Sequence, residues 1–152
     1  MSKFQSTKTF CHSEGFSAAF RQWRATSHCR LIHGYALQFK LTFGAKNLDE
    51  RNWVVDFGGL KDVKEWLRHW FDHTLVVAQD DPKLLELKRL EQEGLAEVRV
   101  MPSVGCEMFA RFVYDYLALW VERSYQGRVH LVSVEVSEHG GNSAIVSTEG
   151  DI

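Results

Sequence analysis

Reactive side chains gather in three short stretches of the sequence. The first, "SHCRLIHGYALQFKLTF" (residues 27–43), places Cys29, His33 and Tyr35 at the start of an alternating segment. Residues two apart on a strand point to the same face, so His33 and Tyr35 share one face. A histidine in place of Tyr35 would make this a His-x-His metal site, and Cys29 beside it is a candidate nucleophile.

The second stretch, "WFDHTLVV", contains the adjacent pair Asp72 and His73. A cysteine nucleophile needs a base to form its thiolate, and the base needs a partner that orients it. Cys29, His73 and Asp72 supply these three types of group. Adjacent Asp-His pairs are common, however, and the alternative is a histidine at the C-terminus of a helix beside a solvated carboxylate.

The third stretch, "VEVSEHGGNSAIV", holds Glu135 and Glu138 on or near a strand. A buried carboxylate can accept two parallel hydrogen bonds from the 2-amino and ring N–H groups of a guanine or a pterin. Glu138 is the candidate for this role. The alternative is that a single glutamate near a turn is a surface residue.

Length and composition favour one folded domain. The chain has 152 residues, the usual size of a single domain, and we expect one domain over residues 1–152. With 45% hydrophobic residues the chain can bury a core, which argues against global disorder. A formal net charge of -2 and the lack of a long Lys/Arg run give no support for binding to nucleic acid or to an anionic membrane.

The sequence shows no signal for membrane insertion or export. Its apolar runs are far shorter than the roughly 20 residues of a membrane helix, and "MSKFQSTKTF" has no apolar signal-peptide core. We therefore expect a cytoplasmic protein. Three cysteines without a CxxC pair do not form a disulfide framework or a zinc knuckle. We interpret Cys11 and Cys106 as reduced thiols packed like small apolar residues.

Hydrophobic periodicity predicts an α+β protein. Residues 31–45 alternate between apolar and polar side chains, the pattern of a half-buried strand. Apolar residues at helical spacing predict helices over residues 60–71 and 105–125, and Pro82 and Gly94 mark the limits of another. The remaining predictions are strands or extended segments at residues 15–20, 53–57, 95–101 and 128–148, the last with a turn at residues 140–142.

Six stretches, taken in order, resemble the motifs of the 6-pyruvoyl-tetrahydropterin synthase / 6-carboxytetrahydropterin synthase family of tunnelling-fold enzymes. "GFSAAF" resembles F-x-A-A-H, "CRLIHGY" resembles C-x-x-x-H-G-H, and "WVVDFGGLK" resembles G-x-V-x-D-F-x-x-L-K. "FDHTLV" resembles L-D-H-x-x-L-N, "GCEMFA" resembles S-E-N-x-A, and "VEVSEHGGNSAIV" resembles V-x-V-x-E-T with its hairpin. The resemblance implies an antiparallel four-stranded sheet in ββααββ order, with helices on one face, that oligomerises into a barrel.

The resemblance also implies an activity and a role for each matching residue. The Cys-x3-His spacing favours the bacterial carboxy branch, which converts 7,8-dihydroneopterin triphosphate to 6-carboxy-tetrahydropterin on the route to 7-deazaguanines such as queuosine. Cys29 matches the catalytic cysteine, and Asp72 and His73 match the pair that activates it. Glu138 matches the glutamate that anchors the pterin, and His33 matches one zinc ligand. A homo-oligomer, expected to be a hexamer with active sites between subunits, is implied.

The chain departs from the family at the zinc site. The family's zinc has three histidine ligands, but here Phe20 and Tyr35 stand at two of those positions. A catalytic zinc needs three protein ligands and one open position, so His33 alone cannot hold it. Replacement ligands by sequence are His12, His28 and His139, and Cys29 could ligate instead of attack. We expect a pterin site without metal.

Two further functions remain open beside a carbon–oxygen lyase of the carboxytetrahydropterin synthase type. One is a non-catalytic tunnelling-fold module that binds a pterin or purine, or that assembles with an active relative. The other is a related reaction on a different purine-like substrate. Loss of turnover in Cys29→Ala, or loss of ligand binding in Glu138→Ala without any turnover, separates the first two.

Overall fold

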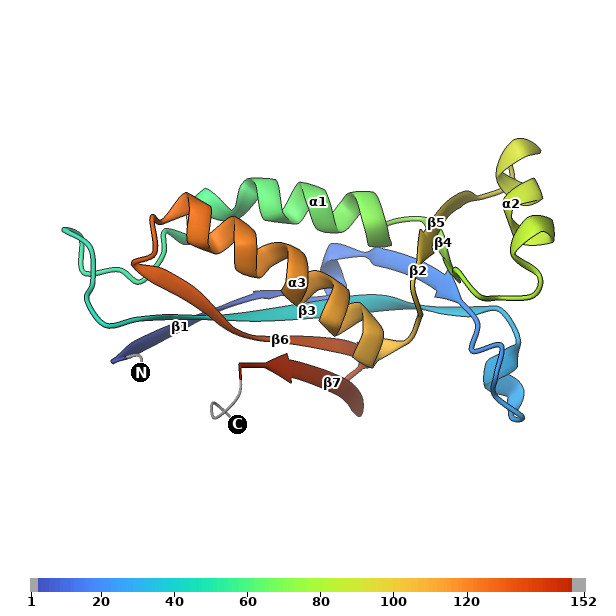
Figure 1. Cartoon of the computed structure of the whole chain (residues 1–152), viewed down its shortest axis with the longest axis horizontal. Coiled ribbons are helices and arrows are strands. Elements are labelled where there is room, and N and C mark those ends of the chain that lie inside the picture. The colour runs from blue at the N-terminus through green and yellow to red at the C-terminus, as the bar shows by residue number, and fades with distance from the viewer. Residues whose placement is uncertain (1–2, 149–152) are drawn as a thin grey trace.

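The computed structural model describes residues 3–148, so the predicted domain limits at residues 1 and 152 lie outside the described part. Three strands come first, the α-helices then alternate with two further strands, and two strands follow the last helix (Figure 1). The strands are β1 (Phe4–Phe10), β2 (Phe16–Phe20), β3 (His33–Ala45), β4 (Thr74–Ala78), β5 (Glu97–Met101), β6 (Val129–His139) and β7 (Asn142–Ser147). The α-helices are α1 (Lys61–Phe71), α2 (Leu84–Gln92) and α3 (Cys106–Ser124), and short 3-10 turns lie at His12–Glu14, His28–Arg30 and Phe57–Leu60.

The strands form one mixed sheet in the order β5-β4-β2-β3-β6-β7, with β1 also paired to β3. β1, β3, β6 and β7 pair antiparallel, whereas β4 lies parallel to β2 and β5 lies parallel to β4. The α+β class is confirmed, but the predicted antiparallel four-stranded sheet in ββααββ order was wrong in strand number and order. Seven strands are present among the described residues, and two pairings are parallel.

β4 escaped prediction because of its burial. All five of its residues are buried, so the strand has no polar alternation to reveal it. Continuous apolar runs of this kind are typical of strands covered on both faces. The predicted extended segment at residues 53–57 was also wrong, because this stretch bends into the 3-10 turn, where the Asp56 carboxylate accepts a hydrogen bond from the Gly58 N–H at 2.9 Å.

α1 and α3 pack on one face of the sheet, and α2 lies with β4 and β5 at one end of the molecule (Figure 1). Both helices bury residues spaced by four, which line up on one side of a helix. α1 buries Val63, Leu67 and Phe71 in this way. The predicted alternation of β3 is confirmed, because Leu37, Phe39, Leu41 and Phe43 are fully buried beneath the helices.

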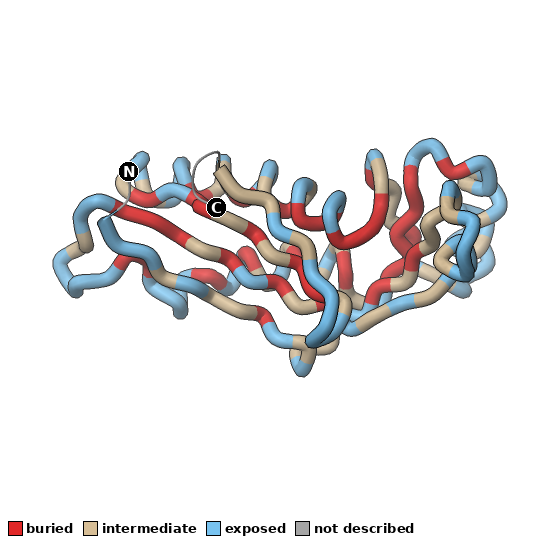
Figure 2. The backbone as a smooth tube through the Cα atoms, turned by 90° about the horizontal axis from the view of Figure 1, so that it is seen from below, coloured by how far each residue is buried: buried red, intermediate tan, exposed pale blue. Residues whose placement is uncertain are grey.

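The opposite face of the antiparallel strands is open, and buried and accessible positions alternate along the long strands (Figure 2). Lys40 is exposed, and its neighbours Gln38 and Thr42 are half-buried. Among the described residues, the structure contains no helix with the length and apolar character needed to span a membrane.

Candidate functional site

β2 and β3 present the candidate residues on two opposite faces of the sheet. Phe20 lies opposite His33, and Ala18 lies opposite Tyr35, so these side chains share the face that carries the helices. Gly34 points to the other face. A Cβ at this position would lie 2.6 Å from the carbonyl oxygen of Ala18, so only glycine allows the two strands to approach this closely.

Phe20, His33 and Tyr35 converge, as positions of one metal site would. Their ring centroids lie 5.1 Å (Phe20–His33), 6.2 Å (Phe20–Tyr35) and 5.6 Å (His33–Tyr35) apart. Phe20 is almost fully buried and also contacts Phe109 of α3, with a centroid distance of 5.1 Å. We call Phe20, His33 and Tyr35 the aromatic cluster; packing, rather than coordination, holds it together.

The donor set of the aromatic cluster does not fit a catalytic zinc. The Nδ1 atom of His33 lies 2.7 Å from the carbonyl oxygen of Leu31, which only accepts, so Nδ1 donates and Nε2 keeps its lone pair. His33 is therefore the single imidazole ligand of the cluster. Over residues 3–148 no group of three or more His, Cys, Asp or Glu side chains is arranged to hold a metal ion. Within the described residues of one chain, His12, His28 and His139 complete no such group, although the His139 ring centroid lies 6.2 Å from that of Tyr35.

Tyr35 lies near Glu138, the candidate anchor of the substrate, and near two cysteines. Burial, and then the negative charge of Glu138, raise the pKa of the Tyr35 phenol, with smaller contributions from Cys29 and Cys106. The phenol therefore stays protonated at neutral pH and is a hydrogen-bond donor. Cys29, Cys106 and Glu138 thus lie within electrostatic range of the aromatic cluster.

Glu138 lies at a bulge, where the register of β6 and β7 shifts between Ser137 and His139. It lines a cavity of about 500 Å³ together with Cys106 and Glu107 from the first turn of α3. Burial, and then Glu138, raise the pKa of Cys106 to about 12, so this thiol stays neutral. The prediction of Cys106 as a packed, buried thiol is confirmed, and its place beside Glu138 was not predicted. The same prediction for Cys11 was wrong, because Cys11 lies just after β1 and is exposed.

Cys29 lies in the 3-10 turn His28–Arg30, in the loop that joins β2 to β3. Ser27 caps this turn, because its Oγ accepts a hydrogen bond from the Cys29 N–H at 3.3 Å. The Cys29 carbonyl oxygen accepts from the Gln22 N–H at 2.9 Å. Both main-chain groups of Cys29 are therefore bound, and its half-buried thiol is the group left for chemistry.

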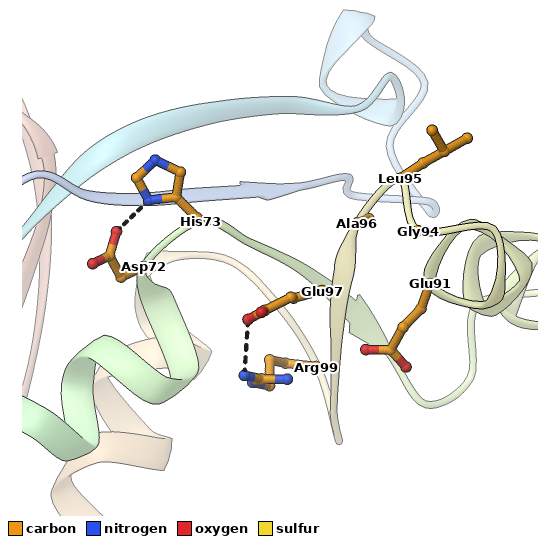
Figure 3. Close-up of a pocket in the computed structure, with 8 residues that line it drawn as sticks. All are labelled: Asp72, His73, Glu91, Gly94, Leu95, Ala96, Glu97 and Arg99. Carbon is orange, nitrogen blue, oxygen red and sulfur yellow. Dashed lines mark hydrogen bonds and ion pairs between the residues drawn. The ribbon is translucent and has the colours of Figure 1, made fainter.

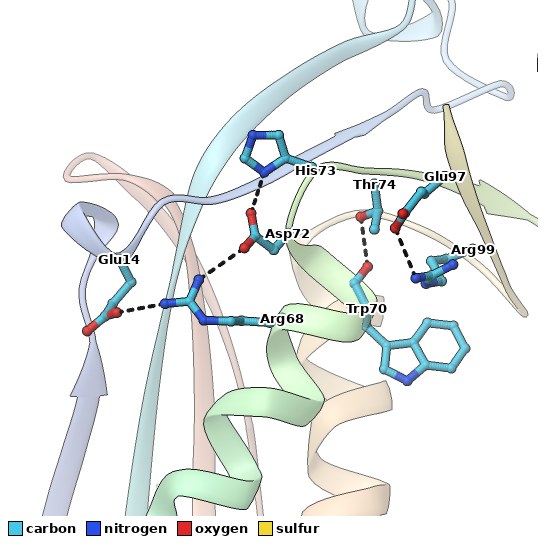
Figure 4. A network of polar contacts seen from close by, with 8 residues as sticks. All are labelled: Glu14, Arg68, Trp70, Asp72, His73, Thr74, Glu97 and Arg99. Atoms are coloured by element: carbon cyan, nitrogen blue, oxygen red, sulfur yellow. Dashed lines mark hydrogen bonds and ion pairs between the residues drawn. The ribbon is translucent and has the colours of Figure 1, made fainter. Parts of the chain in front are cut away.

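His73 and Asp72, the expected base and its orienting partner, form a hydrogen bond at the end of α1. His73 Nδ1 lies 2.6 Å from Asp72 Oδ1, and Arg68 Nη1 donates to Asp72 Oδ2 at 3.0 Å (Figure 4). Asp72 thus orients the ring and leaves His73 Nε2 free to exchange a proton. His73 has a positive φ of 57°, which turns its side chain out of α1 so that it is 85% exposed.

Sequence reasoning missed the residues that support this pair. Arg68 lies one helical turn before Asp72 and also donates to Glu14 Oε2 at 3.4 Å (Figure 4). The spacing of four residues between Arg68 and Asp72 on a helix was the available signal. Arg99, which bonds Glu97 at 3.3 Å, had no such signal, because β5 approaches His73 only in the folded chain.

His73 opens into a cavity of about 860 Å³ (Figure 3). Asp72 and His73 form one wall of this cavity. The other wall comes from the end of α2 and from β5, through Glu91, Gly94, Leu95, Ala96, Glu97 and Arg99.

The structure separates the candidate residues into two groups. His73 also lines a second hollow with Ser17, Ala19 and Gly34, which lie on the open face of β2 and β3. The aromatic cluster lies on the opposite, helix-covered face. Among the contacts of residues 3–148, none joins Cys29 to Asp72 or His73. Within one chain, the predicted Cys-His-Asp set is therefore not joined by hydrogen bonds.

Comparison with known proteins identifies a family and a fold. The family model "6-pyruvoyl tetrahydropterin synthase" matches residues 9–149. A 6-carboxy-5,6,7,8-tetrahydropterin synthase of Aquifex aeolicus is 28% identical over 134 residues, which cover 86% of this chain and 82% of that protein. The protein of the same name from Rickettsia bellii is 39% identical over 70 residues, which cover 45% of this chain and 51% of that protein.

Two solved structures show the same fold over nearly the whole chain. An uncharacterized protein of Wolinella succinogenes superposes with a TM-score of 0.82 at 20% identity, covering 96% of this chain and 98% of that one. The 6-pyruvoyl tetrahydropterin synthase of Plasmodium falciparum superposes with a TM-score of 0.65 at 17% identity, covering 97% and 99%. At these identities the likeness concerns the fold alone.

Proposed function

The chain belongs to the 6-pyruvoyl tetrahydropterin synthase family, and we propose that it is a pterin lyase of the 6-carboxytetrahydropterin synthase type. Its substrate would be 7,8-dihydroneopterin triphosphate, on a route to 7-deazaguanines of the queuosine type. The observation that carries the proposal is the 2.6 Å hydrogen bond between Asp72 and His73, which leaves an exposed imidazole nitrogen ready to act as a base.

The remaining roles follow from the chemistry of each side chain. Glu138, in the cavity beside α3, accepts hydrogen bonds from the 2-amino and ring N–H groups of the pterin. His73 Nε2 takes the proton of the Cys29 thiol, while Asp72 holds the proton on Nδ1. The Cys29 thiolate then takes a proton from the side-chain carbon next to the one that bears the triphosphate, and the electron pair of that C–H bond forms a C=C bond as the triphosphate leaves. Formation of 6-carboxy-tetrahydropterin then requires water, which supplies the second carboxyl oxygen, and cleavage of a C–C bond, which releases the other two side-chain carbons as a two-carbon aldehyde.

No step is assigned to zinc, because the aromatic cluster lacks the donors for it. The Tyr35 hydroxyl and His33 Nε2 are the polar groups that remain at the family's metal positions. We propose that the reaction proceeds with these residues and without a metal at this site.

We infer that a second copy of the chain completes the site. If Asp72 and His73 of one subunit face Cys29 and Glu138 of another, the set is complete. Within the described residues, β1 pairs only with β3 and β7 pairs only with β6, so each leaves one edge free to pair with another subunit. These free edges support a homo-oligomeric barrel, and the family resemblance implies that it is a hexamer.

A related reaction on a different purine-like substrate is one alternative. The other is a non-catalytic protein that binds a pterin or purine. The replacement of two metal ligands by Phe20 and Tyr35 favours this alternative. It predicts that a pterin binds to the wild type, that Glu138→Ala abolishes binding, and that no triphosphate is released. Calorimetry without any pterin binding to the wild type would remove it.

The test is incubation of purified protein with 7,8-dihydroneopterin triphosphate, with added zinc or with a chelator, and identification of products by mass spectrometry. We expect 6-carboxy-tetrahydropterin in both conditions. Product only with zinc would show that a metal site exists that the donor set does not reveal. No product in either condition would overturn the lyase and leave the binding protein.

A further inference from the structure

A buried ion pair joins the end of β2 to the segment between β4 and α2. Arg21 follows β2 directly, and its Nε and Nη2 atoms donate to the two carboxylate oxygens of Asp81 at 2.8 and 2.7 Å. The Asp81 side chain is only 1% exposed, and that of Arg21 is 22% exposed. Two parallel hydrogen bonds fix the guanidinium both in position and in orientation.

The third nitrogen of the same guanidinium reaches the loop of Cys29. Arg21 Nη1 donates to the carbonyl oxygen of Arg30 at 3.3 Å, directly after Cys29. The next residue, Gln22, donates its N–H to the Cys29 carbonyl oxygen and its Nε2–H to Val104 O at 2.8 Å, just before α3. Arg21 and Gln22 thus bind the carbonyl groups of Arg30 and Cys29, the last two residues of this turn.

Stability alone does not account for this ion pair. The hydrogen bond from Arg21 lowers the pKa of Asp81, and the hydrogen bond to Asp81 raises the pKa of Arg21, so both groups are charged at neutral pH. Removing two charges from water costs about as much as their attraction returns, and apolar residues of similar volume often stabilise as well. An apolar pair cannot supply an acceptor for the Lys83 N–H, which Asp81 Oδ1 binds at 2.8 Å, or a donor for the Arg30 carbonyl.

We propose that Arg21 and Asp81 are positioning residues for the thiol of Cys29. Asp81 fixes the guanidinium, the guanidinium fixes the Arg30 carbonyl, and the turn His28–Arg30 then holds its thiol in one place. The role rests on the proposed function, because it concerns the same thiol. The proposal gives a function to a charged pair at the end of β4 opposite to Asp72 and His73.

The test measures the reactivity of the thiol separately from turnover. Purified wild type, Asp81→Asn and the double variant Arg21→Met, Asp81→Leu are treated with iodoacetamide over a range of pH, and peptide mapping follows each cysteine. We expect Cys29 alkylation to become about fivefold faster in both variants, because a loosened turn exposes its thiol more often. We expect kcat to fall by about tenfold while KM changes by less than about twofold, because misplacement affects the transition state more than binding.

The chain provides two matched controls. Asp80→Asn removes the neighbouring but exposed pair Arg24–Asp80, whose side chains are 73% and 54% exposed, and we expect it to leave Cys29 alkylation unchanged. Exposed Cys11 reports general reactivity within the same sample.

The double variant separates positioning from stability. It removes both charges together, so it keeps the fold without an unpaired buried charge. Cys29 alkylation at the wild-type rate and pH dependence in this folded variant would overturn the proposal. Absence of turnover in the wild type would instead remove the proposed function, and the alkylation rates would still decide whether the ion pair holds the turn.

Discussion

The two faces of β2 and β3 differ in how far their functional side chains are covered. On the helix-covered face, the aromatic cluster packs against Phe109, and two of its three members offer no metal ligand. On the open face, Asp72 and His73 form a short hydrogen bond and His73 stays 85% exposed. The helix-covered face is thus filled by packing, whereas the open face remains polar and uncovered.

The difference has a physical reason. A buried imidazole at the position of Phe20 would need a metal or another polar partner. Without one, its unpaired polar atoms would cost about 1–3 kcal/mol of folding free energy. Phe20 removes that cost by presenting no polar atom, and it gains contact with Phe109. The open face carries no such penalty, because water or another subunit can satisfy His73.

The largest effect is expected at the thiol that both faces would serve. Cys29→Ala should lower turnover of 7,8-dihydroneopterin triphosphate by about 10³-fold or more, because no other thiol can take its place. Circular dichroism and the melting temperature should match those of the wild type. Undiminished turnover in the folded variant would remove the role of Cys29.

The next effect concerns the buried charge of Asp81. At pH 7, Asp81→Asn should lower the free energy of unfolding by about 3 kcal/mol, because Arg21 is left without its partner. The pKa of Asp81 is lower in the folded protein than in the unfolded chain, so its stabilisation exists at neutral pH and is lost as pH falls through the folded pKa. Denaturant titrations should therefore show the gap between variant and wild type closing in acid. A gap that stays constant down to pH 2 would contradict this assignment.

The aromatic cluster can be converted back into a ligand set. The double variant Phe20→His, Tyr35→His should bind zinc, and zinc at 100 times its Kd should stabilise the variant by about 2.7 kcal/mol. Calorimetric melting with and without zinc measures this gain, and each single variant is the control. Equal melting temperatures for the double variant in both conditions would mean that these side chains do not converge as the pairing of β2 with β3 places them.

The smallest effect is expected at Cys106. Its pKa of about 12 and its burial predict no alkylation of the native protein at pH 9, in contrast to Cys29. Peptide mapping after iodoacetamide treatment measures both residues at once. Labelling of Cys106 at the rate of Cys29 would show that the cavity beside Glu138 is more open than described.

The elements with clear hydrophobic periodicity were the ones that the sequence predicted correctly. The alternation of β3, the two helices that cover the sheet and the final hairpin were all correct, because half-buried elements show their two faces in the residue pattern. β4 was missed because it is buried throughout. The parallel pairing of β2, β4 and β5 was missed because it joins segments far apart in the chain.

The candidate site was predictable where residues are close in sequence. The chemistry of a base and its orienting partner, together with the family resemblance, singled out Asp72 and His73, and strand spacing predicted that His33 and Tyr35 share a face. Which face of the sheet His73 would occupy was not predictable, because a single positive φ at this residue decides it. The link from Arg21 to Asp81 spans sixty residues and left no local pattern.

The separation of the two faces leads to one direct measurement. Differently tagged Cys29→Ala and His73→Ala chains are expressed together, and mixed oligomers that carry both tags are purified and assayed. A site built from two chains predicts that each variant alone is inactive and that an equal random mixture regains about a quarter of wild-type turnover, because one site in four combines an intact Cys29 with an intact His73. A mixture as inactive as its parents would contradict the shared site and return the search for the base to a single chain.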